Sequence, residues 1–280
     1  MESTNNTGDK KQKISCSVSI LTLNSAKHLE KCLNSIKDFD DVFILDGNST
    51  DETLYIAKKR EIAVYKQTDT DEPNVKISNF AMMRDKAVNL CKHDWVLILD
   101  SDEYLSTELI EEIRQTLESE PNTKTAFAIL NLQIINGRII RHSFNEHRYI
   151  RLYNKQGGIK WNLKKAVHEK FDIPADIKTV NLNNCFYNII PSFKECIAKD
   201  NFYLSLVRNK KTLNKNFKAS RSKIMISILM NIARAIYIIF KGLMIYVKHG
   251  FAQSLPPKQV WRYVRYHLII SYIRLKQLKK

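Results

Sequence analysis

The fold of this chain is decided by the stretch Trp95-Val96-Leu97-Ile98-Leu99-Asp100-Ser101-Asp102-Glu103. Its first five residues are apolar, which is typical of a strand buried on both faces of a parallel sheet. The strand ends at two aspartates separated by one residue. Because α/β sheets bind ligands beyond the carboxyl ends of their strands, the stretch predicts an α/β fold with a ligand site at this point.

Strand and helix patterns alternate around that central strand. Strands are predicted at residues 17–22, 42–45 and 63–65, and helices at residues 29–36, 49–59, 78–91 and from 106 onward. Ser49 with Glu52 forms a capping box, which predicts a helix that opens there. We therefore expect a mostly parallel sheet from about residue 15 to 123.

The pattern changes after that region. Two β-rich runs, 126–135 and 138–140, flank Asn136-Gly137, a dipeptide typical of a type I′ hairpin turn. Long helical patterns follow Pro191. We predict a mixed β extension up to about residue 190 and helices beyond it.

The charge distribution divides the chain in two. Its 280 residues include 45 Lys and Arg and 29 Asp and Glu, for a net charge of +16. Residues 201–280 hold 17 of the basic residues and no acidic one, which leaves 28 basic and 29 acidic residues in the first 200. Such asymmetry indicates two parts with different partners. With 44% hydrophobic residues the chain can bury a sizeable core, which excludes a peptide-like or fibrous protein.

These features predict a disordered tail at residues 1–13, a catalytic domain at 14–198 and a basic, membrane-associating helical region at 199–280. The tail lacks the apolar segment of a secretory signal, and the five cysteines form no CxxC pair. We therefore expect free thiols and a cytoplasmic protein. Nucleic acid is not an expected partner, because long aliphatic runs interrupt the basic region where stacking platforms would be needed.

Asp100 and Asp102 are spaced so that both carboxylates can converge on one divalent cation and the diphosphate it neutralises. The sequence has no glycine-rich phosphate loop of Walker or Rossmann spacing, so a metal ion would have to neutralise the phosphate charge. The alternative is that residues 100–103 only cap the following helix and solvate a loop.

Four segments together carry a family resemblance: 17–24 (SVSILTLN), 44–53 (ILDGNSTDET), Asn79-Phe80 with Arg84-Asp85, and 95–103 (WVLILDSDE). They resemble the inverting family-two glycosyltransferases of the GT-A fold. Within that family the chain looks most like bacterial enzymes that add a sugar to lipopolysaccharide inner core or related surface glycans. Those enzymes share the compact Asp-x-Asp-Glu, a later Val-His-Glu, here Val167-His168-Glu169, and a basic helical C-terminus.

The resemblance implies a role for each matching residue. Thr22, Asn24 and Arg84 would line the nucleotide pocket, and Asp46 would contact the base. Asp100 would contact the ribose or the metal, and Asp102 would ligate the Mn²⁺ or Mg²⁺ that bridges the diphosphate. The chain departs from the common pattern at Gly47, where a second Asp is usual, and at Asp85, where Asn is usual.

Inverting transfer needs a general base that takes the proton of the acceptor hydroxyl. Position and resemblance favour Glu169, with His168 orienting it or touching the diphosphate, although the two roles could be reversed. Asp172 is the reserve candidate, and an ordinary polar loop is the alternative. Arg148 and Arg151, around Ile150 in a predicted strand, either bind anionic groups of the acceptor or form a solvated strand face.

The sequence thus predicts a metal-dependent inverting glycosyltransferase. It would move a hexose from a nucleotide-diphosphate sugar, in particular a UDP-sugar, to a lipid-linked bacterial surface glycan such as lipopolysaccharide core. The alternatives are a nucleotidyltransferase and a non-catalytic membrane scaffold that retains the same body. A homo-oligomer is left open.

Residues 224–247 predict one long amphipathic helix. The segment could span a bilayer, but it contains Asn231, Arg234 and Lys241. At about 100° per residue its polar side chains form one stripe, and the remaining surface is apolar. We expect this helix, and a second one after Pro256-Pro257, to lie on the inner face of the cell membrane without crossing it. The alternative is a buried helical subdomain or a dimer interface with a solvated basic edge.

Overall fold

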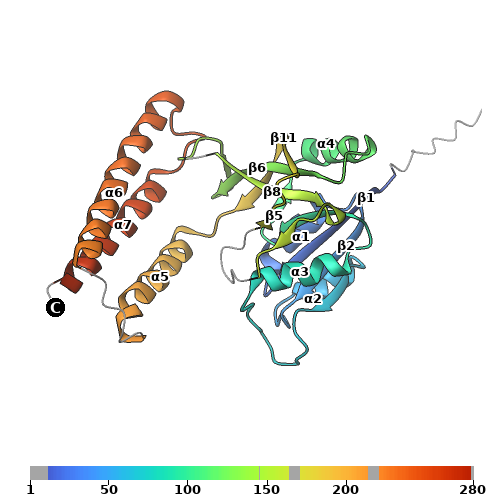
Figure 1. The fold of residues 1–280 in the computed structure, drawn as a ribbon, viewed down its shortest axis with the longest axis horizontal. Coiled ribbons are helices and arrows are strands. Elements are labelled where there is room, and N and C mark those ends of the chain that lie inside the picture. The colour runs from blue at the N-terminus through green and yellow to red at the C-terminus, as the bar shows by residue number, and fades with distance from the viewer. Residues whose placement is uncertain (1–11, 145, 164–170, 214–220, 279–280) are drawn as a thin grey trace, which may run out of the picture. The chain divides into compact units, whose positions relative to one another are not determined.

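The computed structural model describes residues 12–144, 146–163, 171–213 and 221–278 (Figure 1). The predicted disordered tail lies outside the described residues as far as residue 11. The strands are β1 (Ile14–Thr22), β2 (Phe39–Asp46), β3 (Ala63–Lys66), β4 (Trp95–Asp100), β5 (Glu103–Leu105), β6 (Thr125–Ile135), β7 (Arg138–Ile140), β8 (His147–Asn154), β9 (Lys160–Trp161), β10 (Phe171–Asp172) and β11 (Lys178–Ile189). The helices are α1 (Ala26–Ser35), α2 (Thr53–Lys59), α3 (Phe80–Leu90), α4 (Thr107–Glu118), α5 (Phe193–Leu213), α6 (Arg221–His249) and α7 (Pro257–Leu278), with one 3-10 turn, η1 (Lys155–Gly157).

One half of the main sheet is parallel, with the strand order β3-β2-β1-β4. The chain moves outward from β1 to β2 and β3, and then returns to β4 on the other side of β1. This reversal makes the β1/β4 junction a topological switch point, where α/β sheets bind their ligands. The register places Thr22 beside Asp46 and Leu21 beside Asp100. The predicted parallel core is confirmed.

Strand β4 is buried on both faces, as its sequence predicted. Leu97 and Leu99 belong to one hydrophobic cluster, which also contains residues of α1 and α4. Val96 and Ile98 belong to a second cluster, which contains residues of α3. Successive side chains of a strand point to opposite faces, so five apolar residues in a row require helices on both sides.

The other half of the sheet is largely antiparallel. Strand β8 pairs antiparallel with both β4 and β6, and β5 pairs antiparallel with β11. Between β6 and β7, Asn136 and Gly137 have φ angles of 51° and 76°. Two positive φ angles are what a type I′ turn requires. The predicted hairpin and mixed extension are confirmed.

The capping box predicted at Ser49 is wrong. Helix α2 begins at Thr53, and its N-terminal residue Glu52 makes no side-chain cap. The Ser49 hydroxyl instead donates to Asp46, which ties the loop to β2 rather than starting a helix. By contrast, Ser106 caps α4 as its position predicted, because its Oγ accepts from the Leu109 N–H at 3.1 Å.

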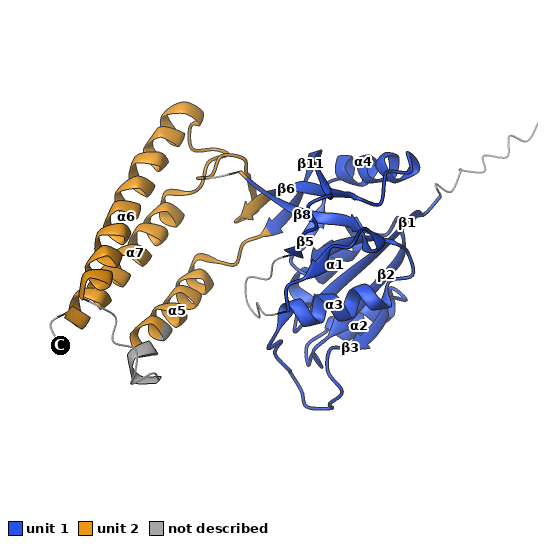
Figure 2. Cartoon of the chain, in the orientation of Figure 1, with its two compact units in different colours: residues 1–131, 147–188 blue, residues 132–146, 189–280 orange. Residues whose placement is uncertain are grey.

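The chain forms two compact units (Figure 2). Unit 1 contains residues 1–131 and 147–188, and unit 2 contains residues 132–146 and 189–280. The boundary that we predicted between residues 198 and 199 falls inside α5. The difference arises because Ile135 and Ile140 of the β6–β7 hairpin pack with Leu255, in the connection between α6 and α7, and with Val260 and Tyr263 of α7.

Unit 2 is built around α7, which packs against both α5 and α6. Helix α6 ends where Gly250 adopts a φ of 69°, a left-handed conformation that glycine takes readily after a helix. Helix α7 begins at Pro257, and proline suits a first helical position because it needs no N–H partner there. Both predicted C-terminal helices are confirmed.

Candidate functional site

Asp46, at the end of β2, holds the ends of two strands together. Its Oδ1 accepts from Thr22 Oγ1 at 2.7 Å and from Ser49 Oγ at 2.6 Å. Its Oδ2 accepts from the Ser49 N–H at 2.7 Å. The carboxylate is buried, so these three donors replace water around its charge.

Asn24 fixes the loop that follows β1. Its φ of 50° lies in the left-handed region, which Asn tolerates better than most residues. Its N–H donates to Ser49 Oγ at 2.8 Å, and its Oδ1 accepts from the Thr50 N–H at 2.9 Å. Its Nδ2 donates to Asn74 Oδ1 at 2.8 Å. The structure therefore brings together Thr22, Asn24 and Asp46, whose roles toward a nucleotide stay predictions.

The surroundings of Gly47 explain why the chain has glycine at the position where a second aspartate is usual. Its N–H donates to the Thr22 carbonyl at 3.0 Å, and its own carbonyl accepts from the Val75 N–H at 2.8 Å. A Cβ at position 47 would lie 2.5 Å from the Val75 oxygen. The loop around Val75 thus occupies the space of a side chain, so an aspartate cannot replace Gly47 without moving that loop.

Gln67 is a site residue that the sequence analysis missed. It is buried, and its Nε2 donates to the carbonyls of Thr22 at 3.0 Å and Leu45 at 3.1 Å. It thereby joins the ends of β1 and β2 from the residue after β3. The available signal was its place directly after a strand, at the edge where ligands bind.

Two arginines and two carboxylates form a cluster at the end of β4. Arg84 of α3 is ion-paired with Asp100, and Arg151 of β8 donates to Glu103 Oε1 at 2.6 Å. Arg151 Nη2 also lies 3.6 Å from Asp100 Oδ2. The second Glu103 oxygen accepts from the Asp100 N–H at 3.0 Å. Arg84 and Asp100 were predicted to lie in the site, and the structure places them in contact.

Arg151 and Glu103 are further members of the cluster. Of the two alternatives for Arg148 and Arg151, a solvated strand face is wrong for Arg151, whereas binding of anionic acceptor groups stays a prediction. Arg151 is largely buried against the Phe186 ring, 4.9 Å from the ring centroid, and Arg148 donates to the Leu182 carbonyl at 2.7 Å. The pairing of β8 with β6 skips Arg151 between Ile150 and Leu152. Such a bulge redirects a side chain, which the alternation of a regular strand does not predict.

The cluster shifts the acidity of its members in opposite directions. Burial, together with the neighbouring Asp100 charge, raises the pKa of Glu103 to about 7. Burial would also raise the pKa of Asp100, but the charges of Arg84 and Arg151 outweigh it and lower that pKa. Asp100 is therefore the carboxylate that stays ionised, and Glu103 is the one nearer to protonation.

The Arg84 guanidinium keeps hydrogen-bonding capacity for a ligand. Its side chain is 3% exposed, and its Nε and Nη1 atoms have no partner among the described residues. Buried donors without partners are rare in proteins, and each one calls for an explanation. An anionic ligand beside Asp100 would satisfy them.

Asp102 lies in the turn between β4 and β5 and is half-buried. Within the described residues, no group of three or more His, Cys, Asp or Glu side chains could hold a metal ion. Mg²⁺ bound with a substrate diphosphate, however, commonly uses only one or two protein carboxylates. Asp100 is already paired with two arginines, and the assignment of the metal to Asp102 and Asp100 stays a prediction.

His168 and Glu169 lie outside the described residues, so their positions stay predictions. The segments that flank them are described: Trp161 of β9 pairs with Phe171 of β10. The Leu163 carbonyl accepts from Asn79 Nδ2 at 2.9 Å, at the start of α3. The reserve base Asp172 is exposed on β10 and accepts from Asn162 Nδ2 at 2.9 Å.

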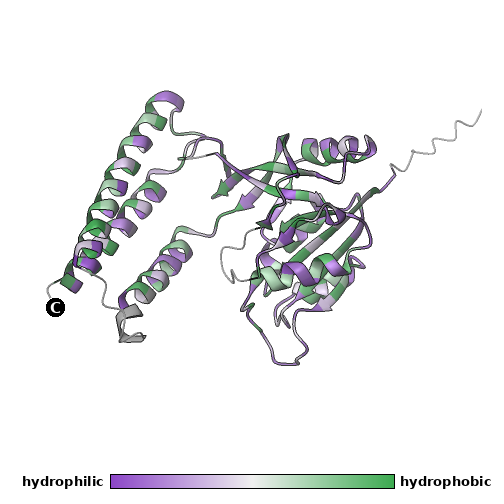
Figure 3. Ribbon diagram, viewed as in Figure 1, coloured by the Kyte–Doolittle hydropathy of each residue, from purple (hydrophilic) through white to green (hydrophobic). Residues whose placement is uncertain are grey.

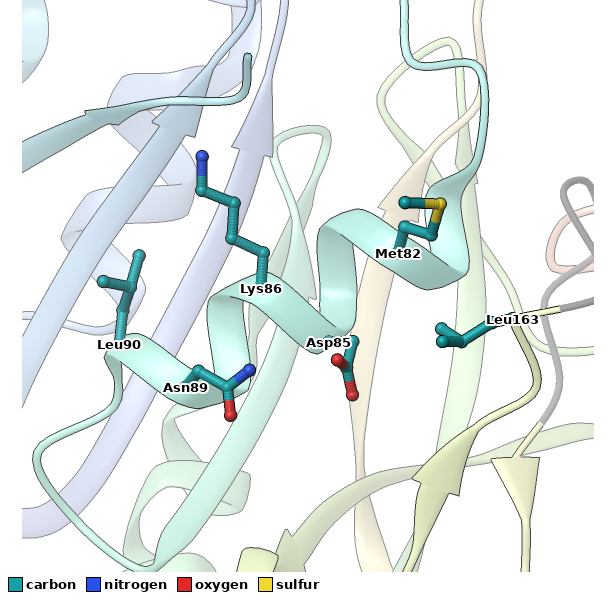
Figure 4. Close-up of a pocket in the computed structure, with 6 residues that line it drawn as sticks. All are labelled: Met82, Asp85, Lys86, Asn89, Leu90 and Leu163. Carbon is teal, nitrogen blue, oxygen red and sulfur yellow. The ribbon is translucent and has the colours of Figure 1, made fainter. Parts of the chain in front are cut away.

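A cavity of about 340 Å³ lies along α3 beside Leu163 (Figure 4). Its lining is formed by Met82, Asp85, Lys86, Asn89, Leu90 and Leu163. Asp85, the second departure from the family pattern, therefore faces this cavity, whereas its neighbour Arg84 pairs with Asp100.

We expect Gly47→Ala to destabilise the fold by about 1–3 kcal/mol, because the added methyl group overpacks against the Val75 carbonyl. Urea denaturation measures the change. Ser119→Thr, which adds a methyl group at the exposed end of α4, is the control and should be near neutral. Equal stability of Gly47→Ala and the parent would show that the Val75 loop moves freely.

The raised pKa of Glu103 predicts a specific pH dependence of stability. The folded protein holds the Glu103 proton up to about pH 7, whereas the usual pKa is 4.5. Between these values the folded state binds more protons than the unfolded state, so the contribution of Glu103 to the free energy of unfolding falls as pH rises.

Glu103→Gln should therefore flatten the fall in stability between about pH 5 and 7, even if it lowers stability overall. Urea denaturation at several pH values gives the slope. Glu118→Gln, at the exposed end of α4, should keep the parental slope. An unchanged slope in Glu103→Gln would assign the titration to another group.

Comparison with known proteins assigns the chain to a family. Residues 17–170 match the family model "Glycosyl transferase family 2". A Rickettsia bellii protein named "Uncharacterized glycosyltransferase" is 29% identical over 193 residues, which cover 66% of this chain and 63% of that protein. A protein of the same name from Rickettsia felis is 28% identical over 219 residues, covering 73% of this chain and 74% of the relative. The chain thus spans slightly less than two thirds of the length of the first of these relatives.

Solved structures also resemble the chain. S. aureus TarS 1-349 in complex with UDP-GlcNAc has a TM-score of 0.47 at 16% identity, covering 93% of this chain and 90% of that one. The predicted α/β fold of GT-A type, with its C-terminal helical region, is confirmed. The family match covers more than half of the chain and includes Asp46, Arg84 and Asp100, so the chain belongs to glycosyl transferase family 2.

Proposed function

We propose that the protein is a metal-dependent inverting glycosyltransferase that transfers a hexose from a nucleotide-diphosphate sugar, in particular a UDP-sugar. The observation that carries this proposal is the buried Arg84 guanidinium, which pairs with Asp100 and keeps two nitrogen atoms, Nε and Nη1, without hydrogen-bond partners among the described residues. It lies at the switch point of the sheet, where a bound diphosphate would meet it.

The nucleoside half of the donor fits the neighbouring strand ends. One hydrogen-bond network holds Thr22, Asn24 and Asp46 there. Gln67 donates to the Thr22 carbonyl and so supports this network. Because the side chains of this network are already fixed, little conformational entropy is lost when a ligand binds to them. We assign the base to the Asp46 side of this network and the diphosphate to the Arg84 side.

The metal fits this arrangement through Asp102. When bound, Mn²⁺ or Mg²⁺ would neutralise the diphosphate that leaves the sugar. Asp100, whose charge is paired with Arg84 and Arg151, holds the position of the strand end beside it. In this proposal Asp102 ligates the metal. Asp100 pairs with the two arginines and contacts the ribose.

Glu169 is the proposed general base and His168 its orienting partner. Leu163, the last described residue before the segment that carries them, accepts a hydrogen bond from Asn79 at the amino end of the helix that supplies Arg84. A base must come within hydrogen-bond reach of the acceptor hydroxyl, directly or through one water. The anchoring of Leu163 at α3 supports an origin of the base from this segment.

For the acceptor we propose a lipid-linked bacterial surface glycan such as lipopolysaccharide core, reached at the cytoplasmic face of the membrane. Support comes from the subgroup resemblance and from residues 201–280, which hold 17 basic and no acidic residues. Polyanionic glycolipids and anionic lipids are complementary to such a segment. A nucleotidyltransferase is disfavoured, since residues 21–27 contain no glycine.

A donor screen tests the proposal as a whole. Purified protein is incubated with UDP-, GDP- and TDP-hexoses, with and without Mn²⁺, and release of the nucleoside diphosphate is measured. We expect release from one UDP-hexose that depends on the metal. Binding of nucleotide without turnover of any donor, even with glycolipid extracts added, would favour the non-catalytic scaffold.

Asp102→Asn should abolish metal-dependent turnover and leave the fold intact. A half-buried turn carboxylate contributes little packing, whereas loss of a metal ligand removes several kcal/mol of leaving-group stabilisation. Titration calorimetry of Mn²⁺ in the presence of UDP measures the metal site directly. Glu118→Gln serves as the charge-matched control. Near-parental turnover and Mn²⁺ affinity in Asp102→Asn would move the metal to other ligands.

Glu169→Gln should lower kcat with little change in the affinity for the nucleotide, because a base acts mainly in the transition state. Asp172→Asn is the matched control, since Asp172 is an exposed carboxylate three residues along the chain. A greater loss of kcat in Asp172→Asn would transfer the role of base to the reserve candidate. A parallel loss of nucleotide affinity in Glu169→Gln would place Glu169 in the donor site.

A further inference from the structure

Helix α6 has one face that is buried within unit 2. The side chains of this stripe recur three, four or seven residues apart and face α7: Ile224, Ile228, Asn231, Ala235 and Gly242. At about 100° per residue they fall within an arc of roughly 60°. The packing therefore covers part of the apolar surface and also Asn231, which the sequence placed in the polar stripe and which contacts His267 of α7.

A second, wider face of α6 is apolar and exposed. Figure 3, coloured by hydropathy, shows green stretches of α6 interrupted by purple ones. Its large side chains have exposed fractions between 39% and 84%: Met225, Ile226, Leu229, Met230, Ile232, Ile236, Tyr237, Ile239, Phe240, Leu243, Met244 and Val247. We call this set the exposed apolar face. It covers an arc of roughly 180°, centred away from the α7 stripe. Contiguous apolar surface of this extent marks a protein or membrane contact.

Four basic residues line one margin of that face. Lys223, Arg234, Lys241 and Lys248 fall within an arc of roughly 40°, between the exposed apolar face and the α7 stripe. Long basic side chains at such a margin can extend their charges to lipid headgroups while their stems cover apolar surface. We call these four residues the basic row.

We propose that α6 lies in the plane of an anionic membrane, with the exposed apolar face at the boundary between headgroups and acyl chains. The charge of the basic row favours an anionic membrane over a second copy of the chain as the partner of this face. A dimer through α6 would bring two basic rows together, and residues 201–280 contain no acidic residue to pair with them. An anionic bilayer supplies both the apolar layer and the counter-charge.

The same contacts argue against a helix that crosses the membrane. By length and composition α6 could span a bilayer, with a mean hydropathy of 1.8 in its most apolar window. However, Asn231 Oδ1 lies 2.8 Å from His267 Nδ1, and Ser271 of α7 donates to the Ile228 carbonyl at 3.4 Å. Spanning would separate α6 from α7 or would take basic residues of α7, among them Arg262, Arg265 and Arg274, into lipid. The in-plane position keeps this packing intact.

This inference does not depend on the proposed reaction, because it concerns a surface of unit 2 and its test needs no donor or acceptor. Sedimentation of the full chain with vesicles provides the test. One set of vesicles is phosphatidylcholine alone, and the other also contains phosphatidylglycerol. The full chain should pellet with the anionic vesicles and be released by high salt.

Two variants separate the contributions of the two surfaces. Ile236→Gln/Phe240→Gln, at two positions that are each 62% exposed, should weaken vesicle binding at least tenfold without changing the melting temperature. Replacing the basic row with glutamine should also weaken binding at least tenfold and remove its salt dependence. Leu54→Gln/Tyr55→Gln, exposed on α2 of unit 1, is the matched control and should bind as the parent does.

Three results would overturn the proposal. One is failure of the full chain to pellet, together with a dimer that Ile236→Gln/Phe240→Gln dissociates, which would assign the face to a second copy. Another is resistance to both high salt and alkaline extraction, which would indicate a spanning helix. The third is equal binding to both vesicle types, which would remove the role of the basic row.

Discussion

The site depends on one electrostatic arrangement, the pairing of two buried arginines with two carboxylates at the end of β4. Arg84 comes from α3, Arg151 from β8, Asp100 from β4 and Glu103 from β5. Four elements far apart in the sequence are therefore joined at one point. Arg84 and Glu103 are buried, and a buried charge that loses its partner costs about 3–5 kcal/mol, so α3 and β5 cannot move away from this point without a large loss of stability.

This arrangement separates two aspartates that look equivalent in the sequence. Asp100 is balanced by guanidinium groups on both oxygens, which lowers its pKa and fixes its position. Asp102 lies in the following turn and is half-buried, and it is the residue to which we assign the metal in the proposed function. A carboxylate is also fixed at the end of β2, where the hydroxyls of Thr22 and Ser49 donate hydrogen bonds that orient Asp46. Preorganised groups of this kind cost little reorganisation when the ligand binds.

Unit 2 is held together by different interactions from those at the end of β4. Its helices are held by apolar packing around α7 and by a few polar contacts such as Asn231 with His267. Because α6 offers apolar side chains on more than one face, packing against α7 uses only part of them. The remaining face and the basic row together have the composition of an interfacial helix, and this is why a membrane is the occupant that we propose.

The sequence by itself determined the parallel core, the β6–β7 hairpin and the long C-terminal helices, because period and turn chemistry are local properties. Through the family resemblance it also predicted that Asp46, Arg84 and Asp100 belong to one site, and the structure pairs Arg84 with Asp100. Only the tertiary structure decided that Ser49 holds a loop instead of starting a helix, and that Arg151 and Glu103 complete the charge cluster. A bulge redirects Arg151, and burial raises the pKa of Glu103. Both effects come from elements distant in the chain, so no local pattern could reveal them.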